Sequence, residues 1–319
     1  MRHSDVYSSS EEARKKLADL LEKEKNRSRP DFFDPVHTRE LYIRGSGGSL
    51  RVLHHHPKGG QGIRPVVFLP GWGTRPEGFM DFLRVVSGVT ECFYVETREK
   101  NSSRLPDKAA AMDMDRNGRD LQEVLRDLGL SEGKDFALLG TCWGSTVAAH
   151  ALAGGFVTPP TAVLYDPMPR LWFPRLLLRY VVPFVPVPMW NLLRPVGRAL
   201  ALRGMREEIQ RKRAEDFING ADLGKWKRAA LSIGDYDLRE VVPRISSEVS
   251  VFTGVPDKIH DQSHYPELTA SIPRGRFFYL PVDESDREYL LGLIARELSG
   301  VSSEESIPGI FQEFEKKLR

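Results

Sequence analysis

Residues 135 to 150 constrain the fold of this chain more than any other stretch. They are Asp-Phe-Ala-Leu-Leu-Gly-Thr-Cys-Trp-Gly-Ser-Thr-Val-Ala-Ala-His, an apolar run that ends in a glycine-flanked turn and continues into small, helix-compatible residues. The pattern predicts a buried strand, a tight turn and a helix, with Cys142 at the apex of the turn. We expect a strained backbone at the apex. A side chain at Gly140 or Gly144 would collide with a neighbouring strand or helix, so both positions require glycine. The thiol would then project from the carboxyl edge of a sheet above a helix amino terminus, a position that lowers a thiol pKa from about 8.5.

The remaining chain alternates between short apolar runs and amphipathic segments. Strands are expected at 38–44, 49–55, 65–69, 92–97, 161–166, 248–254 and 275–281, and helices at 8–27, 76–88, 112–129, 264–271, 285–299 and 309–318. Such alternation predicts an α/β fold with a mostly parallel sheet covered by helices on both faces. We therefore divide the chain into an N-terminal helical arm (1–37), a core (38–167 and 236–302), a Pro-, Arg-, Leu- and Trp-rich helical cap (168–235) and a C-terminal helix (303–319).

Composition excludes several classes of protein. The 319 residues carry a formal net charge of only +2, which does not indicate a nucleic-acid binder. The two cysteines, Cys92 and Cys142, cannot form a disulfide framework. Neither an apolar signal segment at the start nor a run of about 18 uncharged apolar residues is present. We expect a cytoplasmic protein.

This order of elements resembles the α/β-hydrolase family, with its nucleophile on the turn after the fifth strand and its cap after the sixth. The likeness covers about residues 38 to 300. Residues 66–73 (Val-Val-Phe-Leu-Pro-Gly-Trp-Gly) resemble the third strand and oxyanion loop of that family, although Pro70 stands where its usual His would be. Residues 251–257 (Val-Phe-Thr-Gly-Val-Pro-Asp) resemble the seventh strand and the acid of the triad. Residues 276–281 resemble the eighth strand, after which the family places its catalytic His.

That late His is missing here, because residues 282–287 are Val-Asp-Glu-Ser-Asp-Arg and no histidine follows His264. With cysteine at the elbow, the chain resembles dienelactone hydrolases and polyhydroxyalkanoate synthases. The synthases use a similar Gly-x-Cys-x-Gly box for acyl transfer from thioesters. Both of those groups also use the late His. The chain thus resembles their nucleophile and departs from their base.

The resemblance implies a role for each candidate residue. Cys142 would attack an acyl carbon, and the backbone N–H groups of Trp72 and Trp143 would hold the oxyanion. Asp257 would orient the base, with Asp166 as an alternative acid at the end of the sixth strand. His264 is the first candidate for the base and His260 the second; without an imidazole, Asp283, Glu284 or Asp286 would take the proton. Ser285 occupies about the place of the missing His. No cofactor or metal is required.

The remaining histidines are assigned elsewhere. His54, His55 and His56 end an early strand, where a solvated edge is expected and metal binding is the alternative. His150 lies on the elbow helix, two turns from Cys142, and is expected to pack there. Each has a structural interpretation that competes with a chemical one.

The charge and the apolar content of the cap indicate the kind of substrate that it could bind. Residues 170–228 hold 13 Lys and Arg against 5 Asp and Glu, 13 − 5 = +8 net, mixed with aliphatic and aromatic residues. Such a segment suits a lipophilic acyl group, an acyl-CoA or a membrane surface, and equally an ordinary amphipathic cap. We expect a thiol-dependent acyl hydrolase or acyltransferase acting on an ester or thioester. The competing hypothesis is a non-catalytic homologue of these hydrolases that binds a ligand or a protein partner.

Overall fold

The computed structural model describes residues 6–57, 64–106, 110–131, 135–171, 175–203, 208–255, 262–301 and 307–318. Within these ranges, nine strands form one sheet in the order β1-β2-β4-β3-β5-β6-β7-β8-β9. The strands are β1 (Thr38–Gly45), β2 (Gly48–His55), β3 (Val66–Leu69), β4 (Cys92–Val95), β5 (Ala137–Thr141), β6 (Thr161–Tyr165), β7 (Val249–Thr253), β8 (Gly275–Tyr279) and β9 (Glu315–Lys316). The strands from β4 across to β8 are parallel, and β1, β2 and β9 add antiparallel edges.

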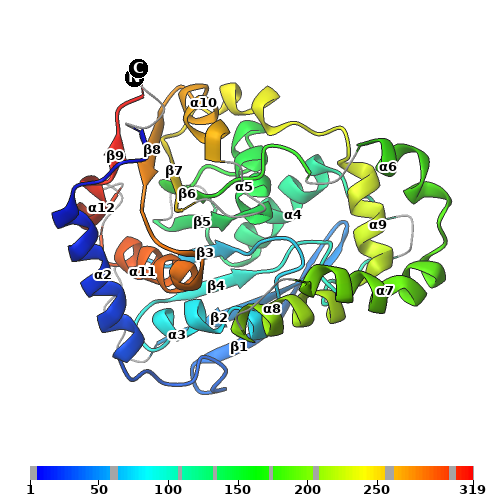
Figure 1. Ribbon diagram of the computed structural model, residues 1–319, viewed down its shortest axis with the longest axis horizontal. Coiled ribbons are helices and arrows are strands. Elements are labelled where there is room, and N and C mark those ends of the chain that lie inside the picture. The colour runs from blue at the N-terminus through cyan, green and yellow to red at the C-terminus, as the bar shows by residue number, and fades with distance from the viewer. Residues whose placement is uncertain are drawn as a thin grey trace.

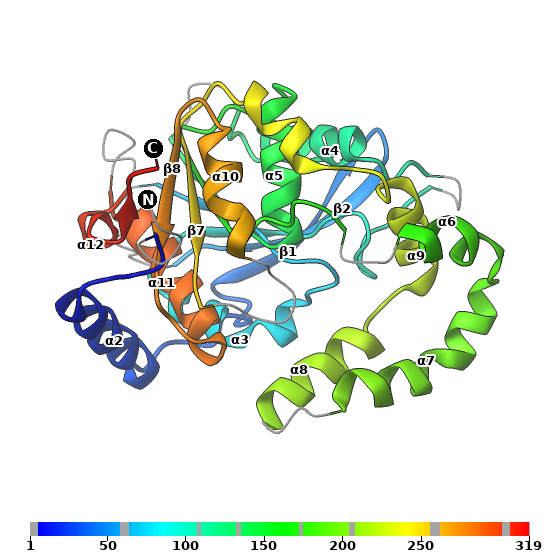
Figure 2. The ribbon, with the colours of Figure 1, turned by 45° about the horizontal axis from the view of Figure 1, so that its top comes forward.

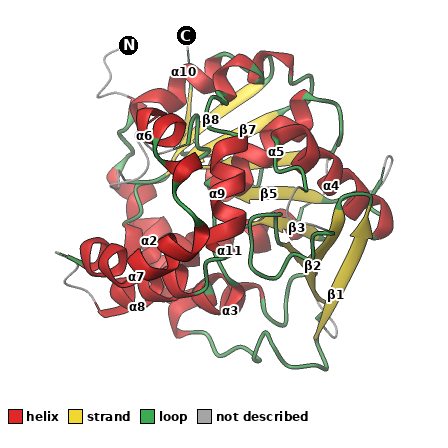
Figure 3. Ribbon diagram, turned by 90° about the vertical axis from the view of Figure 1, so that its right-hand side faces the viewer, coloured by secondary structure: helices red, strands yellow, loops and turns green. Residues whose placement is uncertain are grey.

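Helices connect the parallel strands and cover both faces of the sheet (Figures 1 and 3). They are α2 (Glu11–Asn26), α3 (Met80–Val86), α4 (Met114–Asp127), α5 (Trp143–Ala153), α6 (Arg175–Tyr180), α7 (Val187–Leu202), α8 (Glu208–Asn219), α9 (Leu223–Ser232), α10 (Tyr265–Ala270), α11 (Arg287–Ser299) and α12 (Gly309–Gln312). Short 3₁₀ turns are η1 (Pro76–Gly78), η2 (Val182–Phe184), η3 (Leu238–Glu240), η4 (Val242–Arg244), η5 (Gln262–His264) and η6 (Glu284–Asp286). The mostly parallel, doubly covered sheet confirms the fold class expected from the sequence.

The core consists of two apolar layers, one on each face of the sheet. Helices α4, α5 and α10 pack on one face, where Val124, Ala148 and Leu268 are buried. Helices α2, α3 and α11 pack on the other, where Phe82 and Leu290 are fully buried. The central strands contribute side chains to both layers, so β3, β5, β6 and β7 are buried along their whole length. This continuous burial is typical of parallel strands covered on both sides.

The two ends of the chain pack against the core. Helix α2 is capped by Ser10, whose hydroxyl accepts the N–H of Ala13 at 3.1 Å, and it buries Leu17 and Leu21. The expected C-terminal helix over 309–318 is wrong beyond Gln312, because Glu315 and Lys316 form β9 against β8. The N–H and C=O groups on that side of β8 need partners, and a strand supplies them where a helix would leave them unpaired.

Helices α6 to α9 form the insertion between β6 and β7. Figure 2 shows α7 and α8 reaching beyond the sheet to one side, with α9 leading back to it. Searched over the described residues, the helices include none with the length and apolar character needed to span a bilayer.

Candidate active site

Cys142 lies at the junction of β5 and α5 in a backbone conformation that side chains rarely adopt. Its φ is 51° and its ψ is −117°. The Cys142 N–H donates to the carbonyl of Tyr165 on β6 at 2.9 Å, and the Cys142 carbonyl accepts the N–H of Thr146 in the first turn of α5. The surrounding structure therefore imposes the strained φ, at a cost of the order of 1–3 kcal/mol. The thiol is partly exposed, whereas that of Cys92 is buried.

The two elbow glycines allow the strand and the helix to approach this closely. A Cβ built on Gly144 would lie 2.1 Å from the carbonyl oxygen of Leu69, at the end of β3. A Cβ on Gly140 would lie 2.7 Å from the backbone N and Cα of Ser145. Both clashes are with backbone, which has little freedom to move. The elbow can form only because both positions are glycine.

The loop after β3 lies beside the thiol-bearing residue. A Cβ built on Gly71 would sit 3.4 Å from the Cβ of Cys142, so the backbone of this loop borders Cys142 directly. Among the described residues, the backbone N–H groups of Trp72 and Trp143 donate to no protein acceptor. Unused N–H groups beside a nucleophile are what an oxyanion hole requires.

A buried charged cluster supports this loop from behind, and the sequence analysis did not identify it. Lys100 Nζ donates to the carbonyl of Gly71 and, at 2.7 Å, to Glu99 Oε1, which also accepts the hydroxyl of Thr97. Glu99 and Lys100 are each only 2% exposed. The signal was present in the sequence, since Glu-Thr-Arg-Glu-Lys at 96–100 directly follows a parallel strand at the site edge.

A lysine from the insertion joins the same loop. Lys225 Nζ, on α9, donates to the carbonyls of Lys100 (2.9 Å), Asn101 (3.0 Å) and Ser103 (2.6 Å). Burial lowers the pKa of Lys225 from its usual value. Three carbonyl acceptors match the three donors of an ammonium group, so α9 is held to the core through the loop that also contains Lys100.

Aromatic and aliphatic side chains surround the elbow. The rings of Trp72 and Trp143 meet edge to face at 5.2 Å, and Trp226 of α9 packs against Trp72 at 6.0 Å. The other apolar neighbours are Met114, Val147, Met168, Leu171, Ile233 and Tyr236. The indole N–H of Trp143 is buried without an acceptor among the described residues. Within the described residues, the side chains around Cys142 are thus mostly apolar, and the indole N–H of Trp143 is an unused side-chain donor among them.

Asp166 is the second residue in the described chain, glycines aside, with φ in the left-handed region, at 45°. It directly follows Tyr165, which pairs with Thr141, so Asp166 and Cys142 end neighbouring strands. Asp166 is 2% exposed, and its carboxylate accepts the hydroxyl of Thr253 at 2.7 Å and lies 3.9 Å from Arg287 Nε. Paired backbone strain on adjacent strand ends is common at functional sites.

Of the three residues predicted to handle protons, Asp257, His260 and His264, the structure describes only His264. Asp257 and His260 lie outside the described residues. His264 is exposed at the end of η5, and Gln262 of the same turn donates to the carbonyl of Gly254 just beyond β7. The pairing of His264 with Cys142 therefore stays a prediction.

The segment after β8 holds the carboxylates that were considered in place of the missing histidine. Asp283, Glu284 and Ser285 are exposed, and Asp286 is paired with Lys25 of α2 at 2.9 Å. The Asp286 alternative is therefore unfavourable, because its carboxylate is held by the N-terminal helix.

The structure shows the surroundings of the other histidines considered in the sequence, His150 and His54 to His56. His150 packs on α5 as expected, between Tyr236 Oη (3.1 Å) and Asp115 Oδ1 (2.9 Å). The solvated edge predicted for His54 to His56 is wrong for His55, which is fully buried. His55 Nε2 accepts the N–H of Gly88 at 2.9 Å, and Nδ1 lies 2.8 Å from the hydroxyl of Thr38. Strand alternation explains the difference, since His55 faces the core while its neighbours face away.

Comparison with protein-family models and with characterised proteins finds no match. Solved structures do match. An esterase from Exiguobacterium antarcticum superposes with a TM-score of 0.64 at 17% identity, over 81% of this chain and 98% of that one. A hydrolase from Pseudomonas aeruginosa gives 0.61 at 18%, over 82% and 99%, and an esterase from a Rhodococcus species gives 0.59 at 21%, over 82% and 98%.

The chain has the α/β-hydrolase fold. The identities are too low to carry function from these proteins to this one. Within the fold, Cys142 occupies the turn after β5, and the insertion of α6 to α9 follows β6.

Proposed function

We propose that this protein is a thiol-dependent acyl hydrolase or acyltransferase that acts on an ester or thioester through a Cys142 acyl-enzyme. The observation that carries the proposal is the conformation of Cys142, held at φ 51° with the Gly71 loop in contact. A strained nucleophile turn bordered by unused N–H groups has a direct use in acyl transfer. As a purely structural turn it would cost stability without return.

The acylation step is simplest with a thioester. The Cys142 thiolate forms a bond to the acyl carbon, and the carbonyl π electrons move to the oxygen between the N–H groups of Trp72 and Trp143. When the carbonyl re-forms, the substrate C–S bond breaks and its electron pair leaves as a thiolate, so this step transfers no proton. An alkoxide or amine is a poorer leaving group and must be protonated as it departs.

Deacylation is the step that needs a base. Water or an acceptor alcohol must lose a proton as it attacks the acyl-enzyme, and in this proposal His264 accepts it, oriented by Asp257, with His260 as the second candidate. General-base assistance is typically worth about 10²- to 10⁴-fold. Asp166 is the alternative acid, supported by its burial and its place beside the elbow.

The apolar surroundings support a lipophilic acyl group. Trp72, Trp143 and Trp226 provide an aromatic wall, and Met114 and Met168 add flexible side chains.

The exposed apolar side chains of the insertion support contact with an anionic lipid surface. Large apolar side chains are exposed along α6, η2 and α7: Leu176, Tyr180, Phe184, Met189, Leu192 and Val196. Residues 167–206 contain seven arginines and no Asp, Glu or Lys. A Phe184→Ser/Leu192→Ser variant is expected to lose sedimentation with phosphatidylglycerol vesicles, and equal binding of both proteins would contradict this part of the proposal.

The decisive experiment is intact-mass analysis after incubation with a panel of acyl-CoAs and nitrophenyl esters. The wild-type protein is expected to gain the mass of one acyl group, and Cys142→Ala is expected to gain none. Cys92 is the internal control, because Cys92→Ala removes a buried thiol and should leave the adduct unchanged.

The same experiment tests the competing hypothesis. A non-catalytic binding protein would show no mass change across the panel, and its Cys142 would react slowly with iodoacetamide at pH 7. That pair of results would overturn the acyl-enzyme while leaving the fold intact.

A further inference from the structure

His54, His56 and Glu91 lie close together at the amino edge of the sheet, where the parallel strands begin. Cys142 lies at the opposite, carboxyl edge. Strand β2 ends at His55, and the alternation of side chains along it places His54 on one face and His55 on the other, with His56 following directly on the His54 side. His55 pairs with Cys92, the first residue of β4, so Glu91 comes level with His56. The three side chains therefore converge from two adjacent antiparallel segments.

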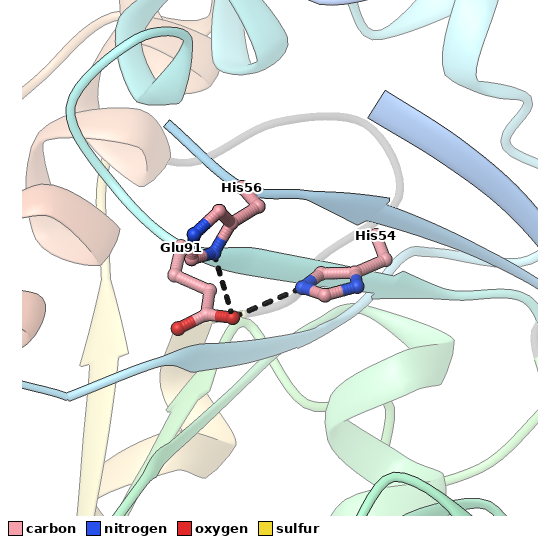
Figure 4. Close-up of side chains that lie close together, drawn as sticks. All are labelled: His54, His56 and Glu91. Atoms are coloured by element: carbon pink, nitrogen blue, oxygen red, sulfur yellow. Dashed lines mark hydrogen bonds and ion pairs between the residues drawn. The ribbon is translucent and has the colours of Figure 1, made fainter. Parts of the chain in front are cut away.

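The distances within the cluster match those between the ligands of one metal ion (Figure 4). Glu91 Oε1 lies 3.0 Å from His54 Nε2 and 3.2 Å from His56 Nδ1, and the three ligand atoms all lie within 4.8 Å of one another. Tetrahedral zinc with bonds of about 2.0–2.1 Å to nitrogen and oxygen holds its ligands roughly 3.3 Å apart. Small side-chain rotations are enough to admit the ion.

Other contacts hold the cluster in place. The ring of His54 stacks on Phe93 with centroids 4.2 Å apart. The backbone N–H of His56 donates to the carbonyl of His37 at 2.8 Å, and the carbonyl of Glu91 accepts the N–H of Val66 at 2.9 Å. The backbone of all three ligands is thus hydrogen-bonded into the sheet or its immediate extension, which is the rigid support that a metal site needs.

We propose that His54, His56 and Glu91 bind one divalent transition-metal ion, with zinc as the best match. Two imidazoles and one carboxylate form a common zinc donor set, and solvent completes the coordination because His56 is 68% exposed. The ion would join the end of β2 to the start of β4. Since Cys142 lies at the opposite edge of the sheet, this site would stabilise the fold and take no part in acyl transfer.

The test is zinc titration of the full-length protein by calorimetry, with Cys142→Ala as the background so that the partly exposed thiol does not compete. One equivalent is expected to bind, and Glu91→Gln and His54→Gln are each expected to weaken binding by about tenfold or more. His264→Gln is the matched control, an exposed histidine at another site, and its affinity should not change. Saturating zinc should raise the Tm by about 5 °C.

Absorption of bound Co²⁺ provides a second measurement that does not depend on variants folding. A tetrahedral site with nitrogen and oxygen ligands gives an intense visible band, and excess Zn²⁺ should abolish it. Absence of saturable binding would overturn the proposal, and so would an affinity that is unchanged in Glu91→Gln and His54→Gln. Loss of binding in His264→Gln would move the site elsewhere and would also overturn it.

Discussion

The two edges of the central sheet carry their reactive side chains in different ways. At the carboxyl edge, Cys142 depends on backbone geometry: a left-handed φ, two glycines and the N–H groups of a loop. At the amino edge, His54 and Glu91 depend on the register of β2 against β4. The first arrangement leaves a local signature in the chain, and the second does not. If the carboxyl edge is specialised for a thiol, it should be sensitive to a change of the residue at 142 and of the glycines around it.

The largest effect is expected from exchanging the nucleophile. Cys142→Ser should reduce acyl-adduct formation by at least about 10³-fold, because a hydroxyl needs a base to become nucleophilic and a thiol needs much less help. Burst kinetics with a nitrophenyl ester measure this directly. If the serine variant keeps a tenth or more of the activity, a strong base stands beside residue 142 and the proposed dependence on the thiol is wrong.

The next largest effect should come from the glycine that lets β3 approach α5. Gly144→Ala should destabilise the protein by about 3 kcal/mol, since the added methyl group meets backbone at 2.1 Å. Urea unfolding measures the loss. Gly197→Ala in α7 is the control, because its Cβ would meet nothing within 4 Å, and it should stabilise by roughly 0.5–1 kcal/mol. Equal effects in both variants would show that the elbow relaxes easily.

The features that the sequence predicts are those that depend on local patterns of residues. The fold and the strand–turn–helix around Cys142 were predictable, because each rests on a local pattern of apolar runs and glycines. The contact of His54 and His56 with Glu91 could not be predicted, because these residues are 35 or more positions apart and the register that joins them has no local sequence pattern. The role of Lys100 was missed for a similar reason, since its partner Gly71 is 29 residues away. The C-terminal strand was missed because pairing with β8 overrode its helical pattern.

At the amino edge, His55 should make stability depend on pH. Burial lowers the pKa of His55 to about 4, against 6.5 when unfolded. The unfolded chain therefore takes up a proton first, so the His55 contribution is present above pH 6.5 and is lost as the pH falls towards 4. Between pH 7 and pH 5 the free energy of unfolding should fall by about 2 kcal/mol from this residue.

The His55 contribution is measured by urea unfolding at both pH values for the wild type and for His55→Gln. The variant should be less stable at pH 7, because the contacts with Thr38 and Gly88 change, but should have a shallower pH dependence. His56→Gln is the control, an exposed histidine one residue away. Identical pH slopes in the wild type and His55→Gln would show that this imidazole does not control the acid sensitivity.

The smallest effect is expected from the charged pair behind the oxyanion loop. Removing one partner alone would leave the other buried and unpaired, so the informative variant is the neutral double substitution Glu99→Gln/Lys100→Gln. Acylation should fall by about tenfold, because Gly71 loses the ammonium that fixes its carbonyl and the Trp72 N–H is aimed less well. Alkylation of Cys142 by iodoacetamide needs no oxyanion hole, so its rate should change by less than about twofold.

The control for the double substitution is Lys16→Gln, which removes a surface lysine paired with Glu313 and should alter neither the acylation rate nor the alkylation rate. A parallel fall in both rates would mean that the pair positions the thiol itself, and the separation between nucleophile and oxyanion loop at this edge would no longer hold.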